Sequence, residues 1–129
     1  MICRYEYKNG ILFQTVPDVI TVNNLHSLSK EMNIIDNEYS IMPNRLVNLQ
    51  AMKSFQGDFN TLLDFVNQRK MILPNQVKMA ILVANDFQFG FAQMIQTLQD
   101  DPKITIEIFL KELKAVEWLN TEDTRLTSY

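Results

Sequence analysis

The chain has 129 residues, a length typical of one ordinary domain. Apolar residues make up 47% of the chain and aromatic residues 10%, which is enough for one hydrophobic core without a stabilising disulfide or metal. The 12 basic and 15 acidic residues give a net charge of −3. Because the basic residues are scattered along the chain and form no stripe, binding to DNA or RNA is not expected.

Neither a membrane span nor a secretory signal is expected. The longest uninterrupted apolar run, Met79 to Ala84, is far shorter than the roughly 20 apolar residues that cross a bilayer. The N-terminal segment carries charges where a signal peptide would need an apolar stretch. The single cysteine, Cys3, cannot form an internal disulfide and suits a reducing compartment, so a cytoplasmic location is expected.

An antiparallel hairpin is predicted at the start of the chain. Cys3, Tyr5 and Tyr7 alternate with charged residues, and Asn9-Gly10 separates this stretch from the apolar segment 11–16. An Asn-Gly pair between β-rich segments favours a type I′ turn, because both residues tolerate a positive φ.

A helix, a strand and a second helix are predicted next. Thr21 is a suitable N-cap for a helix that carries Val22, Leu25, Leu28 and Met32 on one face. A short apolar strand is predicted over Arg45–Gln50, followed by a loop that ends at Asp58, another suitable N-cap. The helix after Asp58 has apolar residues at amphipathic spacing, namely Phe59, Leu62, Leu63 and Val66.

The second half of the chain repeats this alternation. After Pro74-Asn75, the segment Val77 to Ala84 predicts a strand that is buried on both faces. Asn85 or Asp86 is expected to cap a third helix, whose inner side holds Phe91, Met94, Ile95 and Leu98. An alternating strand over 104–110 and a short helix over 111–119 follow Asp101-Pro102, and Asn120 to Tyr129 form a polar tail.

The predicted order is therefore ββαβαβαβα in a single α/β domain over residues 1–119. Strands that alternate with helices imply right-handed crossovers and a mostly parallel sheet, which the N-terminal antiparallel hairpin extends.

No set of catalytic or metal-binding residues emerges from the sequence, and no cofactor is expected. His26, the only histidine, has no nucleophile motif near it, so a helix-surface position is preferred. Cys3 has no activating partner and is expected to be a half-buried, inert thiol. The chain's 3 glycines form no nucleotide-binding motif, and Asp100-Asp101 suits a solvated turn better than a metal site.

Three segments resemble the SpoIIAA-like family, whose fold is shared with STAS domains, the anti-sigma factor antagonists, and is close to the lipid-binding Sec14 type. Residues 46–50 (Leu-Val-Asn-Leu-Gln) stand where the family has a strand ending in a hydrophobic–Asp–Leu pattern. Residues 88–94 are similar to its aromatic–Gly–hydrophobic–Ala helix start, and Ile108-Phe109 with residues 115–119 resemble its Phe…Ala-x-x-Trp-Leu ending. The resemblance runs from Tyr5 to Leu119 and implies a bacterial protein that regulates or binds other proteins.

The chain departs from that family at the residues that would carry regulation. A phosphorylated antagonist has an Asp-Ser-Ser-Gly loop before its second helix, whereas residues 55–59 here are Phe-Gln-Gly-Asp-Phe and contain no serine. Asn48 stands where the family strand usually carries Asp, and Ser54 is the only hydroxyl near the loop. Phosphorylation of this loop is therefore not expected, and Asp58 supplies a helix cap or a permanent negative charge instead.

Two features at one edge of the predicted sheet form the candidate binding site. The loop Gln50 to Asp58 joins the carboxyl end of a parallel strand to a helix N-terminus, where ligands bind in open α/β sheets. Phe87, Phe89 and Phe91 enter the third helix beside the same edge; since residues two apart cannot share a helix face, at least one of these rings should be partly exposed. The candidate partner-binding residues are Asn48, Gln50, Ser54, Asp58, Asp86, Phe87 and Phe89.

Two functions follow as hypotheses. The first is a non-enzymatic interaction module, for which a closed core and an exposed aromatic patch would argue. The second is a binder of a small apolar or lipid-like ligand, for which an apolar cavity of more than a few hundred cubic ångströms would argue. A homodimer is also expected, because the hairpin places Tyr5 and Tyr7 on an edge strand and the aromatic area is large for one small domain. The alternative is a monomer whose edge strand stays in solvent, protected by Arg4, Glu6 and Lys8, and whose exposed rings are scattered. Trp118 is expected to dock the last helix against the sheet.

Overall fold

A five-stranded mixed sheet forms the centre of the fold in the computed structural model, which describes residues 1–70 and 72–121. The strand order is β1-β2-β4-β6-β7. The strands are β1 (Arg4–Lys8), β2 (Ile11–Thr15), β4 (Asn44–Asn48), β6 (Val77–Leu82) and β7 (Ile104–Phe109). β1 and β2 pair antiparallel, whereas β2, β4, β6 and β7 are parallel. The predicted α/β sheet that begins with an antiparallel hairpin is confirmed.

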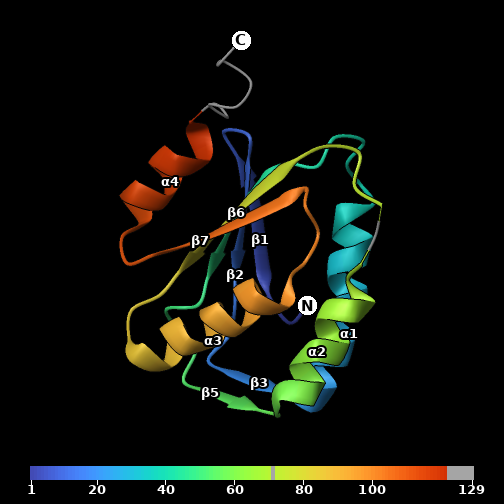
Figure 1. Cartoon of the computed structure of the whole chain (residues 1–129), viewed down its shortest axis with the longest axis vertical. Coiled ribbons are helices and arrows are strands. Elements are labelled where there is room, and N and C mark those ends of the chain that lie inside the picture. Colours follow the sequence, from blue (N-terminus) through green and yellow to red (C-terminus); the bar gives the residue numbers. More distant parts are fainter. Residues whose placement is uncertain (71, 122–129) are drawn as a thin grey trace.

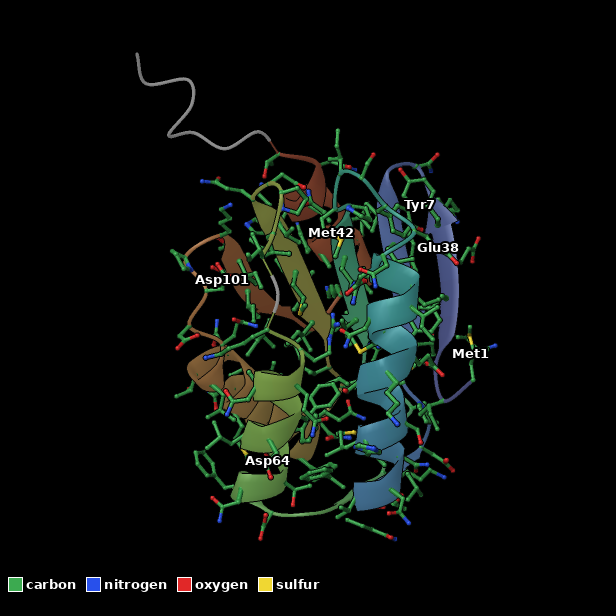
Figure 2. The ribbon with its side chains drawn as sticks, turned by 90° about the vertical axis from the view of Figure 1, so that its right-hand side faces the viewer. Met1, Tyr7, Glu38, Met42, Asp64 and Asp101 are labelled. Atoms are coloured by element: carbon green, nitrogen blue, oxygen red, sulfur yellow. The ribbon has the colours of Figure 1, made fainter. Side chains whose placement is uncertain are left out.

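Four helices in the described part of the chain cover the sheet (Figure 1). They are α1 (Val22–Asp36), α2 (Phe59–Gln68), α3 (Asp86–Leu98) and α4 (Glu112–Asn120). α1, α2 and α3 lie over one face of the sheet, and α4 lies over the other. Figure 2 looks onto α1 and α2, with the sheet behind them. No helix among the described residues is long and apolar enough to cross a bilayer.

The hairpin turn and the helix starts follow the local signals of the sequence. Asn9 and Gly10 adopt φ values of 53° and 80°, as a type I′ turn requires. Thr21 Oγ1 accepts a hydrogen bond from Asn24 N at 3.1 Å, which confirms the predicted N-cap of α1. Asp58 Oδ1 and Asn85 Oδ1 cap α2 and α3 in the same way, each at 2.9 Å. Of the two candidate caps for α3, Asn85 is therefore the cap, and Asp86 is the first helical residue.

The alternation of side chains along the strands divides the core into two layers. Val47, Ile81 and Ile106 point toward α1, α2 and α3, where they join the larger cluster. Leu46, Ala80 and Leu82 point toward α4 and pack with Ala115 and Leu119. Both faces of β4 and β6 are covered, so both faces of each strand carry buried apolar residues, as the sequence of Val77 to Ala84 predicts for β6; in β4 the charged Arg45 is buried among them.

A second, small parallel sheet was not predicted. It pairs β3 (Val19–Thr21), which lies between the predicted hairpin and the first predicted helix, with β5 (Ser54–Gln56) in the segment predicted to be a loop. The carbonyl of Asp18 accepts from Lys53 N at 2.6 Å and from Ser54 N at 3.2 Å, which starts the pairing. Three-residue strands are too short to give a periodic pattern, so only their pairing in space defines them.

The two ends of the described chain differ slightly from the prediction. β1 is an edge strand, as expected, and Tyr7 is exposed on it. Tyr5 is not available at that edge, because its hydroxyl donates to Glu31 of α1 at 2.8 Å and its ring packs against the core. At the other end, Asn120 closes α4 and Thr121 is its C-cap, so neither residue belongs to the predicted tail; residues 122–129 of that tail lie outside the described residues.

Trp118 packs against the sheet as predicted, although its ring is only half-buried. It lies 5.6 Å from the ring of Phe109 in β7, measured between ring centroids. The ammonium group of Lys78 in β6 lies 5.3 Å from the centre of the indole and donates to the Trp118 carbonyl at 3.1 Å. α4 is therefore attached to β6 and β7 through one aromatic side chain and one lysine.

Candidate functional site

The parallel strands end at the edge of the sheet that the sequence indicated as the binding site. Three of the predicted residues, Gln50, Asp86 and Phe87, line a shallow surface hollow there, together with Asp18 and Lys53. The hollow lies between the loop after β4 and the first turn of α3. Its residues come from segments far apart in the sequence. They lie together because each segment follows the carboxyl end of a parallel strand, where binding sites form in open α/β sheets.

Gln88 holds this hollow in shape, and the sequence did not single it out. Its side chain is 1% exposed, and its amide nitrogen donates to the carbonyls of Gln50 at 3.0 Å and Met52 at 2.9 Å. Its amide oxygen accepts from Ala84 N at 2.7 Å. All the hydrogen-bonding atoms of this amide are thus used to fix the loop after β4 against α3. Glutamine in a helix normally points to solvent, so no sequence pattern marks such a role.

The other predicted site residues lie outside the hollow. Asn48 supports it from behind, because its Oδ1 accepts from Gln50 N at 2.8 Å. Ser54 belongs to β5 and is half-buried in the small sheet. Phe89 lies on the exposed side of α3 and does not line the hollow.

Asp58 is a helix cap, and its charge is stabilised by the helix it caps. Its carboxylate accepts from Thr61 N at 2.9 Å and from Thr61 Oγ1 at 2.8 Å. These bonds to Thr61 lower the pKa of the Asp58 carboxyl below its ordinary value of 3.8. Gly57, just before it, lies close to the ring of Phe55: a Cβ at this position would be 2.8 Å from that ring and would force it to shift. The stretch that would hold a phosphoacceptor serine is therefore occupied by a structural turn and a cap.

The three phenylalanines of α3 divide between surface and core by their place along the helix as well as by its period. Phe87 and Phe91, four residues apart, lie on the same side of α3, but Phe87 stands at the exposed N-terminal end, and Phe89 lies on the opposite side. Phe87 is 46% exposed and Phe89 is 42% exposed, whereas Phe91 is 8% exposed. Phe91 packs edge-on against Phe55, with ring centroids 5.1 Å apart. The predicted partial exposure of these rings is confirmed for two of them.

Further exposed apolar side chains share this end of the sheet. Each lies near the N-terminus of a helix that follows the carboxyl end of a parallel strand (Figure 1). We call this surface the carboxyl-end face; its exposed apolar residues are Val22, Phe59, Phe87, Phe89, Leu110 and Leu113. Charged and polar groups lie among them, including Asp58 and Asp86.

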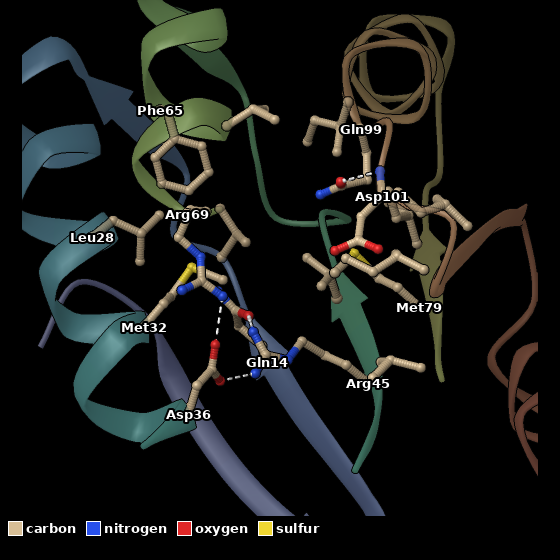
Figure 3. A pocket seen from close by; sticks show the side chains of 18 of the residues that line it. Gln14, Leu28, Met32, Asp36, Arg45, Phe65, Arg69, Met79, Gln99 and Asp101 are labelled. Carbon is tan, nitrogen blue, oxygen red and sulfur yellow. Dashed lines mark hydrogen bonds and ion pairs between the residues drawn. The ribbon is translucent and has the colours of Figure 1, made fainter. Parts of the chain in front are cut away.

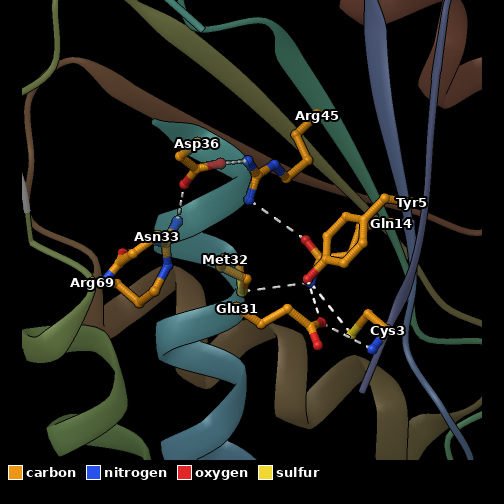
Figure 4. A network of polar contacts seen from close by, with 9 residues as sticks. All are labelled: Cys3, Tyr5, Gln14, Glu31, Met32, Asn33, Asp36, Arg45 and Arg69. Carbon is orange, nitrogen blue, oxygen red and sulfur yellow. Dashed lines mark hydrogen bonds and ion pairs between the residues drawn. The ribbon is translucent and has the colours of Figure 1, made fainter. Parts of the chain in front are cut away.

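A buried cluster of charged side chains lies at the opposite end of the sheet, and the sequence analysis missed it. Asp36, at the end of α1, is 1% exposed and accepts hydrogen bonds from Arg45 of β4 and from Arg69, the C-cap of α2 (Figure 4). Arg45 is 4% exposed and also donates to Gln14 Oε1 at 3.5 Å. A signal was present: Asp36 continues the apolar face of Leu28 and Met32, where an unpaired charge would be costly.

His26 and Cys3, the two residues weighed as possible catalytic groups, have no catalytic partner among the described residues. His26 is exposed on α1. Cys3 was expected to be half-buried, but it is 3% exposed, because α1 covers the start of β1. Burial raises the pKa of its thiol, so the reactive thiolate is disfavoured. Within residues 1–70 and 72–121, no three His, Cys, Asp or Glu side chains group as metal ligands would.

A network of hydrogen bonds surrounds Cys3 and ties the N-terminus to α1 (Figure 4). The carboxylate of Glu31 accepts from Ile2 N at 2.6 Å, from Cys3 N at 3.1 Å and from the Tyr5 hydroxyl at 2.8 Å. Burial is the main cause that raises the pKa of that hydroxyl. The amide of Gln14 donates to the sulfur atoms of Cys3 and Met32, each at 3.5 Å. The polar atoms around Cys3 are therefore used in hydrogen bonds that hold the N-terminus on α1.

The chain was compared with known proteins as well. No protein-family model and no curated protein matches it.

Proposed function

We propose that this protein is a non-enzymatic interaction module that docks a protein partner on its carboxyl-end face. The observation that carries the proposal is the pair of exposed rings in the first turn of α3, Phe87 at 46% and Phe89 at 42% exposure, which extend to opposite sides of the helix at its N-terminal end. Aromatic side chains are enriched at the centres of protein interfaces, because they bury a large area at little conformational cost. The charged groups around them match the polar rim of such an interface.

The surface is also held rigid before any partner arrives, which favours binding. Gln88 fixes the loop after β4, and the N-caps Asp58 and Asn85 fix the first turns of α2 and α3. A preformed surface loses less conformational entropy on association than a mobile one. These hydrogen bonds are made to main-chain groups and do not use the exposed rings of Phe87 and Phe89. The two rings can therefore contact a partner without breaking them.

The proposal extends to the SpoIIAA-like resemblance, which implies a regulatory or interaction module of this kind. The observed order of the main strands and helices is compatible with that fold. The phosphorylated serine of the anti-sigma factor antagonists is proposed to have no counterpart in this chain. In its place Asp58 supplies a permanent negative charge and caps α2. High phosphate occupancy at Ser54, measured by quantitative phosphoproteomics in the native host, would contradict this part of the proposal.

A lipid-like ligand has less support. The main cavity of the fold has a volume of about 140 Å³. Pockets for drug-sized ligands are typically about 300–1,000 Å³. The cavity also has buried charged side chains in its wall, among them Asp36 and Arg45, which an acyl chain could not satisfy.

Site-specific photo-crosslinking in host cells tests the proposal. A photoreactive phenylalanine analogue replaces Phe87 or Phe89 in turn, and Ile41 serves as a control because it is 72% exposed but lies before β4, at the other end of the sheet. We expect one discrete protein adduct from the Phe87 and Phe89 positions and none from Ile41. Equal labelling from all positions, or no adduct from Phe87 and Phe89, would refute the docking face. An adduct of twice the chain mass would identify the partner as a second copy.

A further inference from the structure

The cavity between the sheet and the helices has a charged end and an apolar body. It lies under α1, α2 and α3 and is lined on the sheet side by inward residues of β2, β4, β6 and β7 (Figure 3). Most of its lining is aliphatic or aromatic, including Leu28, Phe65 and Met79. The buried cluster of Asp36, Arg45 and Arg69 forms one part of the wall.

The charges of the cluster do not balance. Two guanidinium groups, those of Arg45 and Arg69, share the single carboxylate of Asp36. Their side chains are 5% and 14% exposed, and that of Asp36 is 0% exposed. The remaining partners, Gln14 and Asn33, are neutral, so the cluster has one positive charge in excess away from bulk water. Burial lowers the pKa of Arg69; the charge and hydrogen bond of Asp36 oppose this effect, and Arg45 adds a smaller lowering.

Among the described residues, each buried side-chain nitrogen already has a hydrogen-bond partner, but the two guanidinium groups have further N–H bonds to donate. A guanidinium has more N–H donors than Arg45 and Arg69 use on Asp36, Gln14 and Asn33. A carboxylate is the group that such donors bind best, because two parallel N–H bonds fit its two oxygens. Gln99 at the other side of the cavity directs its amide nitrogen toward the same space (Figure 3).

The cavity reaches the surface between the C-terminal ends of α2 and α3. Lys70 in its lining is exposed, and Gln99 and Asp101 are half-exposed. Three basic and two acidic side chains line the whole cavity, and the acidic Asp101 stands at the mouth, so the positive excess is confined to the end formed by Arg45 and Arg69. Lys70 forms an ion pair with Asp100 at 3.2 Å, outside the lining, so its charge is partly compensated at the mouth.

The volume limits the size of an occupant. The cavity measures about 140 Å³. An engineered protein cavity of about 150 Å³ holds one benzene molecule. Without a ligand, a fully apolar cavity stays empty, whereas a cavity with polar groups in its wall takes up water. The wall is apolar over most of its area and positive at one end, so it suits a molecule with an apolar body and a negatively charged group at one end.

We propose that this cavity binds a small organic monocarboxylate, of about the size of benzoate, whose carboxylate pairs with Arg45 and Arg69 while its apolar body lies against Leu28 and Phe65. The charged end of this cavity lies at the opposite end of the sheet from the docking face, and the proposal does not depend on that face. The ligand supplies the negative charge that the cluster lacks and fills the apolar space.

Benzoate and benzamide, which share a shape but differ in charge, are the probes for this site. Binding is followed by ¹H–¹⁵N spectra of the full chain. We expect benzoate to shift the amide signals around Arg69, Gln99 and Ile106, and benzamide to shift them far less. Equal binding of the two probes, or no binding of benzoate, would overturn the proposal and leave the cluster as an internal ion-pair network of the fold.

Two variants separate a site from a general charge effect. Arg69→Gln should weaken benzoate binding about tenfold or more, since a charge-assisted hydrogen bond is lost. Arg4→Gln, which removes the same charge from an exposed position on β1, should leave it unchanged. If Arg69→Gln does not fold, Leu28→Phe, which fills the cavity with a ring and keeps all charges, decides instead: it should abolish benzoate binding. Unchanged affinity in Leu28→Phe, or in folded Arg69→Gln, would place benzoate elsewhere and contradict the assignment.

Discussion

The side-chain amide of Gln88 donates to the main-chain carbonyl of Met52 at 2.9 Å and joins the first turn of α3 to the loop after β4. The same side chain bonds to the main chain at Gln50 and Ala84. Buried acceptors and donors that lose their partner cost free energy, because water cannot replace it. The shape of the carboxyl-end face therefore depends on one glutamine.

Replacing Gln88 by leucine tests this dependence. Gln88→Leu keeps the size of the side chain but leaves main-chain groups of three residues without their partner, so the free energy of unfolding should fall by about 2–4 kcal/mol. Gln93→Leu, on the exposed side of the same helix, is the matched control and should change it by less than about 0.5 kcal/mol. Urea denaturation measures both; similar losses in the two variants would show that Gln88 is not the clamp.

Asp36 should be among the least replaceable residues of the fold. Asp36→Asn removes the only carboxylate in contact with the guanidinium groups of Arg45 and Arg69 in the described cluster. Breaking a buried ion pair by removing one partner costs about 3–5 kcal/mol. Asp64→Asn, an exposed position on α2, makes the same chemical change without that cost. Urea unfolding of the two variants compares them directly, and an Asp36→Asn variant as stable as Asp64→Asn would contradict a stabilising role.

The contribution of Asp58 should depend on pH in a defined direction. Because hydrogen bonds to Thr61 lower the pKa of its carboxyl in the folded state, the charged cap stabilises the protein above the unfolded pKa of 3.8. This stabilisation should be lost as the pH falls through the lower, folded pKa. The difference in unfolding free energy between the wild type and Asp58→Ala should therefore be largest near neutral pH and shrink in acid. A difference that grows in acid would have the wrong sign for this mechanism.

Trp118 should contribute to the attachment of α4, though less than a fully buried tryptophan. Truncating a buried aromatic residue costs about 3–5 kcal/mol, and because this ring is half-buried we expect about 2–4 kcal/mol for Trp118→Ala. The melting temperature should fall by several degrees. Trp118→Phe, which can still stack on Phe109, should lose less, and Leu113→Ala, exposed on the same helix, should lose little. A melting temperature unchanged within a degree or two in Trp118→Ala would show that α4 is not held by this ring.

Self-association is the remaining expectation, and two surfaces offer a route to it. β1 is an open edge strand with Tyr7 exposed at 56%, and Phe87 and Phe89 are exposed on the carboxyl-end face. Sedimentation equilibrium on the order of tens of micromolar should show a dimer. Tyr7→Lys should weaken a dimer formed through the edge, and Phe89→Ser one formed through the carboxyl-end face. A single species with the mass of one chain would exclude the dimer at that concentration.

The helices and main strands could be predicted because their signals act over a few residues. The Asn9-Gly10 turn, the N-caps Thr21 and Asp58, and the apolar period of each helix each depend on neighbours close in the chain. β3 and β5 could not be predicted, because strands of three residues gain their definition only from each other.

The candidate site divides in the same way. Gln50, Asp86 and Phe87 could be placed at one edge because the carboxyl ends of parallel strands meet there. Gln88 could not be identified, because its partners Gln50 and Met52 lie 38 and 36 residues away in the sequence.

Sequence alone therefore determined the α/β order, the hairpin, the caps and the edge at which exposed phenylalanines gather, since all of these follow from local chemistry and periodicity. Only the tertiary structure decided the fate of the buried polar groups. Arg69 meets Asp36 because α2 packs against α1, and Arg45 meets it because β4 runs beneath both helices. A charge on an apolar face shows that a partner is needed, but the packing of helices and sheet decides which residue becomes that partner and leaves one positive charge beside a cavity.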